Sequence, residues 1–168
     1  MKQLCKFSTI EDFWRYFNHI PKPADVFYTG DGQKLVGPEG SGVNVKEFSL
    51  FKRGIEPEWG DPGNCTGGEW FCRQPIEPTH LNLYWQNLVI GVIGNAIDDP
   101  EIRYVNGARV VDKGSRNNFP LFRLELWIST KDVEVRNRLK TRLMEVITEG
   151  CPPPKKGHLS FDWKDHTV

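Results

Sequence analysis

The sequence has no net charge, because 22 lysine and arginine residues balance 22 aspartate and glutamate residues. A protein that follows a long stretch of nucleic acid needs a basic stripe to neutralise the phosphates. The balanced charge therefore argues against an extended nucleic-acid footprint, but it leaves room for a pocket that reads a single nucleotide.

The sequence also lacks paired cysteine motifs and long apolar runs. Its four cysteines, Cys5, Cys65, Cys72 and Cys151, form no CxxC motif and no Cys/His ligand spacing. We expect them to be reduced thiols of a cytosolic, cytoplasmic protein. No apolar run reaches the length of a membrane span, so no membrane partner is expected.

Catalytic signatures are missing as well. The four histidines, His19, His80, His158 and His166, have no readable nucleophile or metal partner. The glycine-rich segment GPEGSG neither follows a strand nor leads into a helix, so it is not a dinucleotide-binding fingerprint. An enzyme is therefore disfavoured, and no cofactor or metal is expected.

What the sequence does have is tryptophan, six in 168 residues. Trp59 lies in a stretch from Phe48 to Phe71, among prolines and glycines that cannot pack inside a helix or a strand. Two interpretations are open at this point: a loop folded back on the core, or a flat aromatic platform for a planar ligand such as a nucleobase.

The order of elements predicts an α+β fold in one domain, residues 1–168, with a surface insertion at about 21–47. Apolar periodicity predicts helices at 10–20, 78–97 and 131–149, with Ser8 or Thr9, Thr79, and Ser129 or Thr130 as their caps. Alternation and turn residues predict strands at 4–7, 48–53, around Trp70, and at 102–105, 107–112, 121–128 and 159–163. Hairpins rather than βαβ units indicate an antiparallel sheet with three helices packed on one face.

Two of these helices carry more apolar surface than one buried face needs. Trp14 lies at the edge of the first apolar stripe, and the helix at 78–97 is apolar almost all round. Such a helix is either fully buried or part of an interface. For Trp14, core packing and partial exposure are both open.

Several segments in the right order resemble the eukaryotic translation initiation factor 4E family, which binds the 5′ cap of messenger RNA. The segments are STIEDFWRYFNHI, SLFKRGIEPEWGD followed by GGEWF, LYWQNLVIGVIGNAI, NGARVV, and the LW of LELWIS. The resemblance implies a cupped sheet with helices on its convex back and a slot for 7-methylguanosine on the concave side.

The resemblance assigns base recognition to the stretch around Trp59. Trp59 matches the second of two tryptophans that sandwich the methylated base, while the first lies upstream of the position that matches Met1. Either this chain is truncated relative to its relatives or another aromatic substitutes, with Phe27, Tyr28 and Trp163 as candidates. Gly60 stands where the family has its guanine-reading carboxylate. Asp61 or Glu58 could reach the guanine instead, and Asp61 is favoured, although Asp61 is equally suited to capping its own turn.

The resemblance also implies the remaining contacts to the cap. Trp127 matches the tryptophan that contacts the methyl group. Lys113 matches a phosphate-binding residue, and Arg116 is the best candidate for another. Glu69 stands at a third basic position of the family and is a charge reversal.

On the back of the sheet, the resemblance implies docking of an amphipathic helix from an initiation scaffold of the 4G type or a related 4E-binding protein. The expected contacts are Ile10, Trp14, Gln86, Asn87 and Ile90, and Gln86 replaces a leucine of the family. The alternative function is an interaction scaffold or translational regulator of the same fold with weak or lost cap binding.

Overall fold

The computed structural model describes residues 3–28, 45–100, 102–114, 120–155 and 157–167. Most of the predicted insertion at 21–47 and the predicted phosphate contact Arg116 lie outside these residues. Within the described part of the chain, no helix has the length and apolar character needed to cross a membrane.

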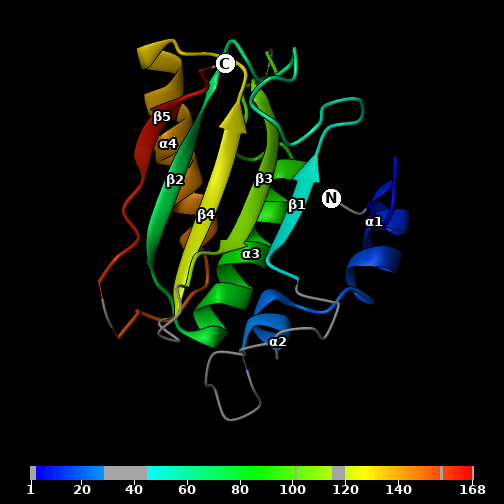
Figure 1. The fold of residues 1–168 in the computed structure, drawn as a ribbon, viewed down its shortest axis with the longest axis vertical. Coiled ribbons are helices and arrows are strands. Elements are labelled where there is room, and N and C mark those ends of the chain that lie inside the picture. The colour runs from blue at the N-terminus through cyan, green and yellow to red at the C-terminus, as the bar shows by residue number, and fades with distance from the viewer. Residues whose placement is uncertain (1–2, 29–44, 101, 115–119, 156, 168) are drawn as a thin grey trace.

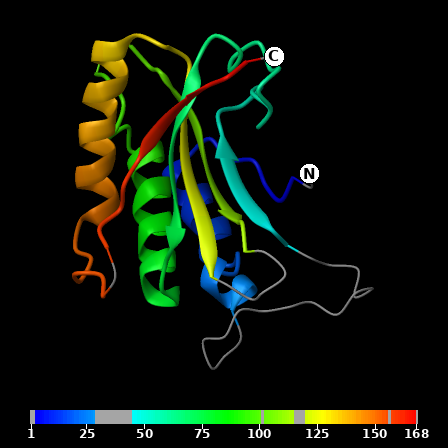
Figure 2. The same cartoon turned by 60° about the vertical axis from the view of Figure 1, so that its left-hand side comes forward.

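Five strands form one antiparallel sheet in the order β1-β3-β4-β2-β5 (Figure 1). The strands are β1 Glu47–Phe51, β2 Gly68–Pro75, β3 Val105–Asp112, β4 Leu121–Ile128 and β5 Asp162–Asp165. The helices are α1 Ile10–Phe17, α2 Pro23–Phe27, α3 Pro78–Ile93 and α4 Val133–Thr148. Figure 2 shows α3 and α4 on one face of the sheet. The predicted α+β fold with an antiparallel sheet is confirmed, and α2 is a short fourth helix.

Helix ends follow local capping. The Thr9 side chain accepts a hydrogen bond from the Asp12 amide at the start of α1, as predicted. The start of α4 was predicted wrongly. The cap is Asp132, three residues after Ser129, and its side chain accepts a hydrogen bond from the Val135 amide. For α3 the cap position is Glu77 rather than Thr79, and Pro78 occupies the first turn, where it has no amide to satisfy.

Three strand predictions were wrong in position. Residues 4–7 form no strand. Residues 102–104 are not a strand of their own, because the Asp98 carboxylate accepts from the amides of Tyr104 and Val105 at 2.7 and 3.2 Å and holds this segment outside the ladder. The last strand begins at Asp162, after Leu159 and Phe161 have packed into the core.

The two faces of β4 have different chemistry. Phe122, Leu124, Leu126 and Ile128 are fully buried in the core that α3 and α4 cover. Arg123, Glu125 and Trp127 alternate with them and therefore lie on the opposite side. We call this side, away from α3 and α4, the open face.

At Gly107 the backbone of the sheet is approached too closely for any side chain. A Cβ atom built on Gly107 of β3 would collide with the Leu50 carbonyl oxygen and the Phe51 ring. Phe51 in turn packs edge-on against Trp127, with ring centroids 5.3 Å apart. Gly107 therefore allows β1 to deliver Phe51 to the open face.

We predict that Gly107→Ala lowers the free energy of unfolding by about 1–3 kcal/mol, because β1 must move to relieve the collision. Gly60→Ala is the matched control, since a Cβ there meets no atom of the described residues within 4 Å, and it should change stability by less than about 0.5 kcal/mol. Urea unfolding followed by circular dichroism measures both. Equal stability of the two variants would contradict the proposed role of Gly107.

Candidate functional site

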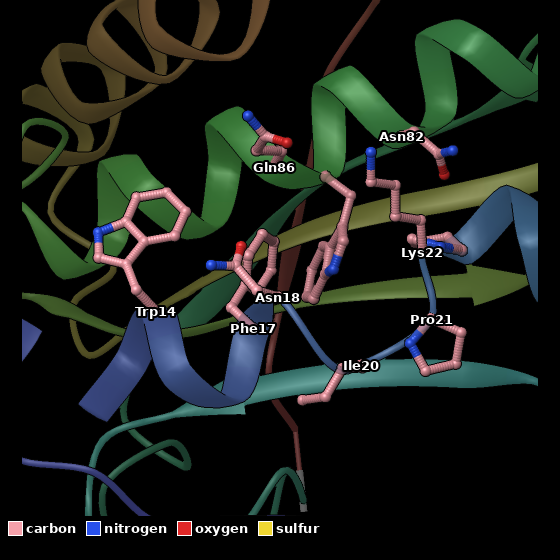
Figure 3. Close-up of a pocket in the computed structure, with 10 residues that line it drawn as sticks. Trp14, Phe17, Asn18, Ile20, Pro21, Lys22, Asn82 and Gln86 are labelled. Atoms are coloured by element: carbon pink, nitrogen blue, oxygen red, sulfur yellow. The ribbon is translucent and has the colours of Figure 1, made fainter. Parts of the chain in front are cut away.

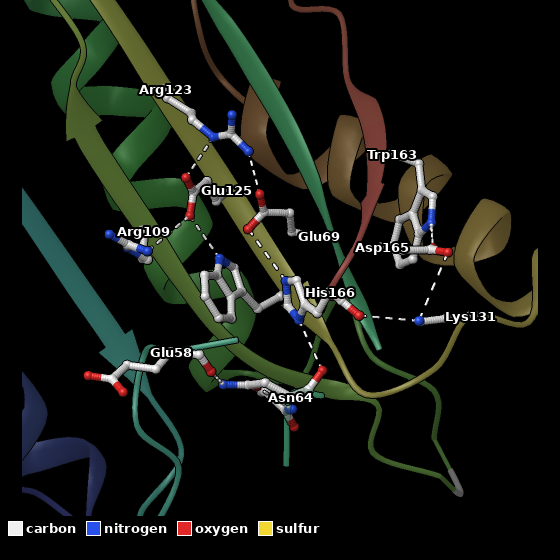
Figure 4. A network of polar contacts seen from close by, with 12 residues as sticks. Glu58, Asn64, Glu69, Arg109, Arg123, Glu125, Lys131, Trp163, Asp165 and His166 are labelled. Carbon is white, nitrogen blue, oxygen red and sulfur yellow. Dashed lines mark hydrogen bonds and ion pairs between the residues drawn. The ribbon is translucent and has the colours of Figure 1, made fainter. Parts of the chain in front are cut away.

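The open face carries arginine and glutamate side chains of neighbouring strands that pair with one another. Arg123 forms ion pairs with Glu69 and, through Nε at 2.6 Å, with Glu125. Arg109 lies between Glu125 at 3.7 Å and Glu47 of β1 at 2.5 Å. Figure 4 shows the contacts of Arg123 with Glu69 and Glu125, and of Arg109 with Glu125, running across neighbouring strands. The register explains them, because Glu125 lies directly opposite Arg109 in the ladder.

The surroundings of Glu125 and Glu69 shift the pKa values of these two buried carboxylates in opposite directions. Desolvation, together with the nearby charge of Glu69, raises the pKa of Glu125 against the opposing effects of Arg109, Trp127 and Arg123. Desolvation also acts to raise the pKa of Glu69, but the hydrogen bond to His166 and the charges of Arg123, His166 and Lys164 together lower it. Glu69 is therefore the carboxylate of the pair that keeps its negative charge most firmly.

Trp127 lies on the open face, as expected for a residue that contacts a ligand there, but only 1% of its surface is exposed. Its indole Nε1 donates to Glu125 at 2.8 Å. The ring is covered by Phe51, by the Arg109 guanidinium 5.5 Å from its centroid, and by the His166 ring at 4.4 Å. Trp127 is therefore buried beneath the side chains that cover the open face.

Trp59 is half-buried on the loop between β1 and β2. The Lys164 ammonium lies 3.9 Å from the centroid of its indole. The His166 ring is tilted by only 18° from the indole, with centroids 5.9 Å apart. Trp59 is thus not a core residue, because it is only half-buried, and its ring is not free, because the Lys164 ammonium already lies over it.

The carboxylate of Asp61 is engaged within its own loop. One oxygen accepts from the Glu56 amide at 2.9 Å and the other from the Gly63 amide at 2.8 Å. These contacts match the turn-capping interpretation, and a guanine contact by Asp61 stays a prediction. Glu58 is exposed, and among the described residues its carboxylate forms no hydrogen bond or ion pair.

The three candidates for a second stacking aromatic are placed away from Trp59. Phe27 and Tyr28 are buried against Phe122 on the helix side of the sheet, and the Tyr28 hydroxyl donates to the Ile76 carbonyl at 2.6 Å. Burial raises the pKa of Tyr28. Trp163 packs against Trp70 and beneath Arg136 of α4, so it also faces the helices. As placed here, none of them can sandwich a base against Trp59.

The phosphate contacts are described only in part. Lys113 follows β3 and is exposed, and its amide donates to the Leu121 carbonyl at 2.9 Å. Arg116 lies outside the described residues. Sequence reasoning missed Arg109 and Arg123, although the alternation of β4 places Arg123 on the same face as Trp127. Within the described residues, no three His, Cys, Asp or Glu side chains gather in a way that could hold a metal ion.

A groove of about 310 Å³ lies on the other side of the molecule, between α1, α3 and the segment that follows α1 (Figure 3). Trp14 and Phe17 of α1, Gln86 and Asn82 of α3, and Lys22 line it. Trp14 is 37% exposed, which agrees with its predicted place at the edge of the stripe.

The other predicted partner contacts divide into free and engaged side chains. Ile10 and Ile90 are exposed. Asn87 is directed to α4 instead, since its amide donates to the carbonyls of Ile147 and Glu149 at 3.2 and 2.9 Å. These bonds use only the side-chain nitrogen of Asn87, and its role in partner binding stays a prediction.

Comparison with known proteins gives the same fold. The chain is 28% identical over 148 residues to eukaryotic translation initiation factor 4E-2 of Schizosaccharomyces pombe, covering 88% of this chain and 52% of that protein. It superposes with a TM-score of 0.71 and 25% identity on Ascaris suum eIF4E-3 in complex with an m2,2,7G cap, covering 99% of this chain and 79% of that one. A C. elegans eIF4E-3 bound to the 4E-binding protein Mextli gives a TM-score of 0.68 at 25% identity, covering 96% and 79%.

The chain spans about half the length of the first curated relatives it matches, for example 52% of the S. pombe protein and 63% of initiation factor 4E of Saccharomyces cerevisiae. The family model described as eukaryotic initiation factor 4E matches residues 1–167, which is nearly the whole chain. With the antiparallel sheet, the helices on one face and Trp59 and Trp127 on the other side, this match shows that the chain belongs to the eukaryotic initiation factor 4E family.

Proposed function

We propose that this protein binds the 7-methylguanosine 5′ cap of mRNA on its open face and acts in translation initiation in the cytoplasm. The observation that carries the proposal is the Lys164 ammonium on the Trp59 ring, 3.9 Å from the centroid. An indole that holds a cation suits a flat cationic ligand, and N7-methylated guanine is such a ligand. When the methylated base takes the place of the Lys164 ammonium on the Trp59 ring, base stacking worth about 1–3 kcal/mol adds to the cation–π attraction.

We assign recognition of the guanine edge to Glu58 in preference to Asp61. Both oxygens of Asp61 accept backbone amides of its own turn, whereas the Glu58 carboxylate is exposed beside Trp59. A carboxylate at this edge can accept from two N–H groups of guanine in a charge-assisted pair. Gly60, which holds the family's carboxylate position, has no side chain to offer.

We assign the phosphate chain to Lys113, with Arg116 as a further predicted contact. Lys113 is exposed and directly follows the last residue of β3. Arg123 and Arg109 are also cationic, but their guanidinium groups are already paired with Glu69, Glu125 and Glu47. A phosphate reaches them only by displacing a carboxylate.

On the back of the sheet, we propose that the groove between α1 and α3 accepts an amphipathic helix of an initiation scaffold of the 4G type or a related 4E-binding protein. Trp14, Ile10 and Ile90 are exposed around it. Apolar side chains spaced along one face of a helix fill such grooves, and a half-exposed tryptophan is a frequent centre of the binding energy.

A second candidate function is a same-fold interaction scaffold or translational regulator with weak cap binding. The 1% exposure of Trp127, the glycine at position 60 and the pairing of Glu69 with Arg123 favour it. Titration with methylated and unmethylated cap analogue separates the two functions, because only the cap-binding protein prefers the methylated base.

We predict that Trp59→Ala abolishes retention on cap-analogue resin and the quenching of tryptophan fluorescence by cap analogue. The loss should be at least about tenfold in affinity, since it removes the stacking surface. Trp163→Phe is the control, because Trp163 faces α4 and should leave both signals intact. Retention that survives in Trp59→Ala, or is lost in Trp163→Phe, contradicts the assignment of Trp59.

We predict that Gly60→Glu, made in a Glu58→Gln background that removes the assigned carboxylate, tightens binding of 7-methylguanosine triphosphate by about tenfold to a hundredfold, because a charge-assisted pair to the guanine edge is worth roughly 1.5–3 kcal/mol. The described residues leave the space around a Cβ at this position empty, so the new side chain fits. Gly60→Gln is the control for added bulk. Isothermal titration measures both, and an equal gain in the two variants rules out guanine-edge recognition.

We predict that Trp14→Ala weakens binding of a peptide carrying the family's partner motif by about 2 kcal/mol or more, while cap binding is unchanged. Gln86→Leu should tighten the same peptide, because the glutamine amide is desolvated without an assured partner. Fluorescence anisotropy of a labelled peptide measures both variants. Unchanged peptide affinity in Trp14→Ala, or an unfolded domain, would move the docking surface elsewhere.

A further inference from the structure

Lys164 occupies the surface on which the proposed site stacks a base. It lies in β5, and its ammonium is 3.9 Å from the centroid of the Trp59 indole. Among the described residues, this ammonium forms no ion pair with a carboxylate. The indole ring thus takes the place of a counter-charge for this lysine.

The register of the sheet brings Lys164 to the open face. Lys164 lies directly opposite Glu69 of β2, and directly opposed residues of an antiparallel pair project from the same face. The preceding β5 residue, Trp163, projects from the other face, because it packs against Trp70 on the helix side. The position of Lys164 in the strand therefore directs its side chain toward Trp59.

The loop that carries the indole is held by buried contacts. The Asn64 side-chain amide donates to the carbonyls of Glu56 and Glu58 at 2.8 and 3.0 Å. Asn64 is fully buried, and its own carbonyl oxygen is 3.0 Å from Nδ1 of His166. Lys164, by contrast, is exposed and carries its charge on a flexible four-carbon stem. Of the two partners, the lysine is the one that moves when a ligand binds.

A base that takes the place of the ammonium on Trp59 must displace it. The N7-methylated base is itself a cation, and two cations over the same ring repel each other. The displaced ammonium also loses its attraction to the indole. Glu69, opposite Lys164 in the ladder, offers little in exchange because it already pairs with Arg123. Binding of the methylated base alone therefore carries the full cost of moving the lysine.

A nucleotide offsets part of that cost because it brings its own anion. A phosphate joined to the base through one ribose stays close to the lysine that the base has displaced. The ammonium has three donors and pairs with phosphate as a mobile point charge. Arg109 and Arg123 can bind the same phosphate only by giving up a carboxylate. Lys164 has no carboxylate partner to give up among the described residues.

We propose that Lys164 is a specificity-determining residue that makes the open face select a nucleotide over the corresponding nucleoside. In the free protein its ammonium covers Trp59, and in the complex it leaves the ring and pairs with the phosphates of the ligand. The selectivity rests on the proposed cap-binding function, whereas the covering of Trp59 in the free protein does not.

The first experiment needs no ligand and measures the ¹H chemical shifts of the lysine side-chain methylenes by NMR in the full chain. We expect the protons beside the Lys164 ammonium to be shifted upfield by the Trp59 ring and to return to ordinary values in Trp59→Leu. Lys140 is the internal control, since its ammonium lies 4.5 Å from the centroid of Trp70, and its shift should be the same in both proteins. Ordinary shifts for Lys164 in the wild type overturn the proposal.

The second experiment measures the affinities for 7-methylguanosine and for 7-methylguanosine triphosphate by isothermal titration. Lys164→Gln removes the charge but keeps a polar side chain, so we expect it to bind the nucleoside more tightly and the triphosphate more weakly. The preference for the triphosphate should fall by about tenfold, roughly the contribution of one charge-assisted contact. Lys140→Gln is the matched control, because it neutralises a lysine that covers a tryptophan on the helix side, and it should keep the wild-type preference.

The outcomes separate this proposal from the function on which it rests. If the ligands bind and the preference is unchanged in Lys164→Gln, the role of Lys164 is overturned while cap binding stands. An equal fall in Lys140→Gln also overturns it, since the effect is then one of net charge and not of the contact with Trp59. If neither the wild type nor Lys164→Gln binds either ligand, the cap-binding function fails and the selectivity fails with it.

Discussion

Buried charge on the open face constrains the rest of this structure. Arg123 and Arg109 lie among Glu69, Glu125 and Glu47, and removing one partner leaves another charge desolvated and unpaired. The sheet register, the place of Trp127 beneath Arg109 and the contact with His166 all depend on this arrangement. Glu69 is therefore more than a lost phosphate contact, because it completes an ion-pair network that a basic residue could not complete.

Much of the fold could be predicted from local patterns. The alternation of residues 121–128 defines a two-faced strand, and the stripe from Ile10 to Phe17 defines a helix with Trp14 at its edge. The predictions failed where a carboxylate a few residues away competed with the expected pattern. Asp98 binds the amides at 104 and 105 and shortens a predicted strand, while Asp132 caps α4 later than Ser129 or Thr130 would.

The site was harder to predict than the fold because its contacts join residues far apart in the sequence. Trp59 and Trp127 were predicted as site residues because tryptophan on a glycine- and proline-rich loop, or in a family motif, is conspicuous. His166 was not, because its partner Asn64 lies 102 positions away in the sequence. Nor could composition show that Phe27 and Tyr28 face the core, since this follows from their packing against Phe122.

The paired arginines also affect how a ligand could bind. A phosphate that approaches Arg123 exchanges one anion for another, so its net gain is smaller than that of a phosphate meeting an unpaired cation. Under the proposed cap-binding function, binding energy then comes mainly from the base, through the Trp59 ring and the groups that hold it. A loop fixed by Asn64 avoids the entropy cost of ordering the indole on binding. In the proposed site, the charge network that weakens phosphate binding therefore makes the position of Trp59 the decisive feature of the open face.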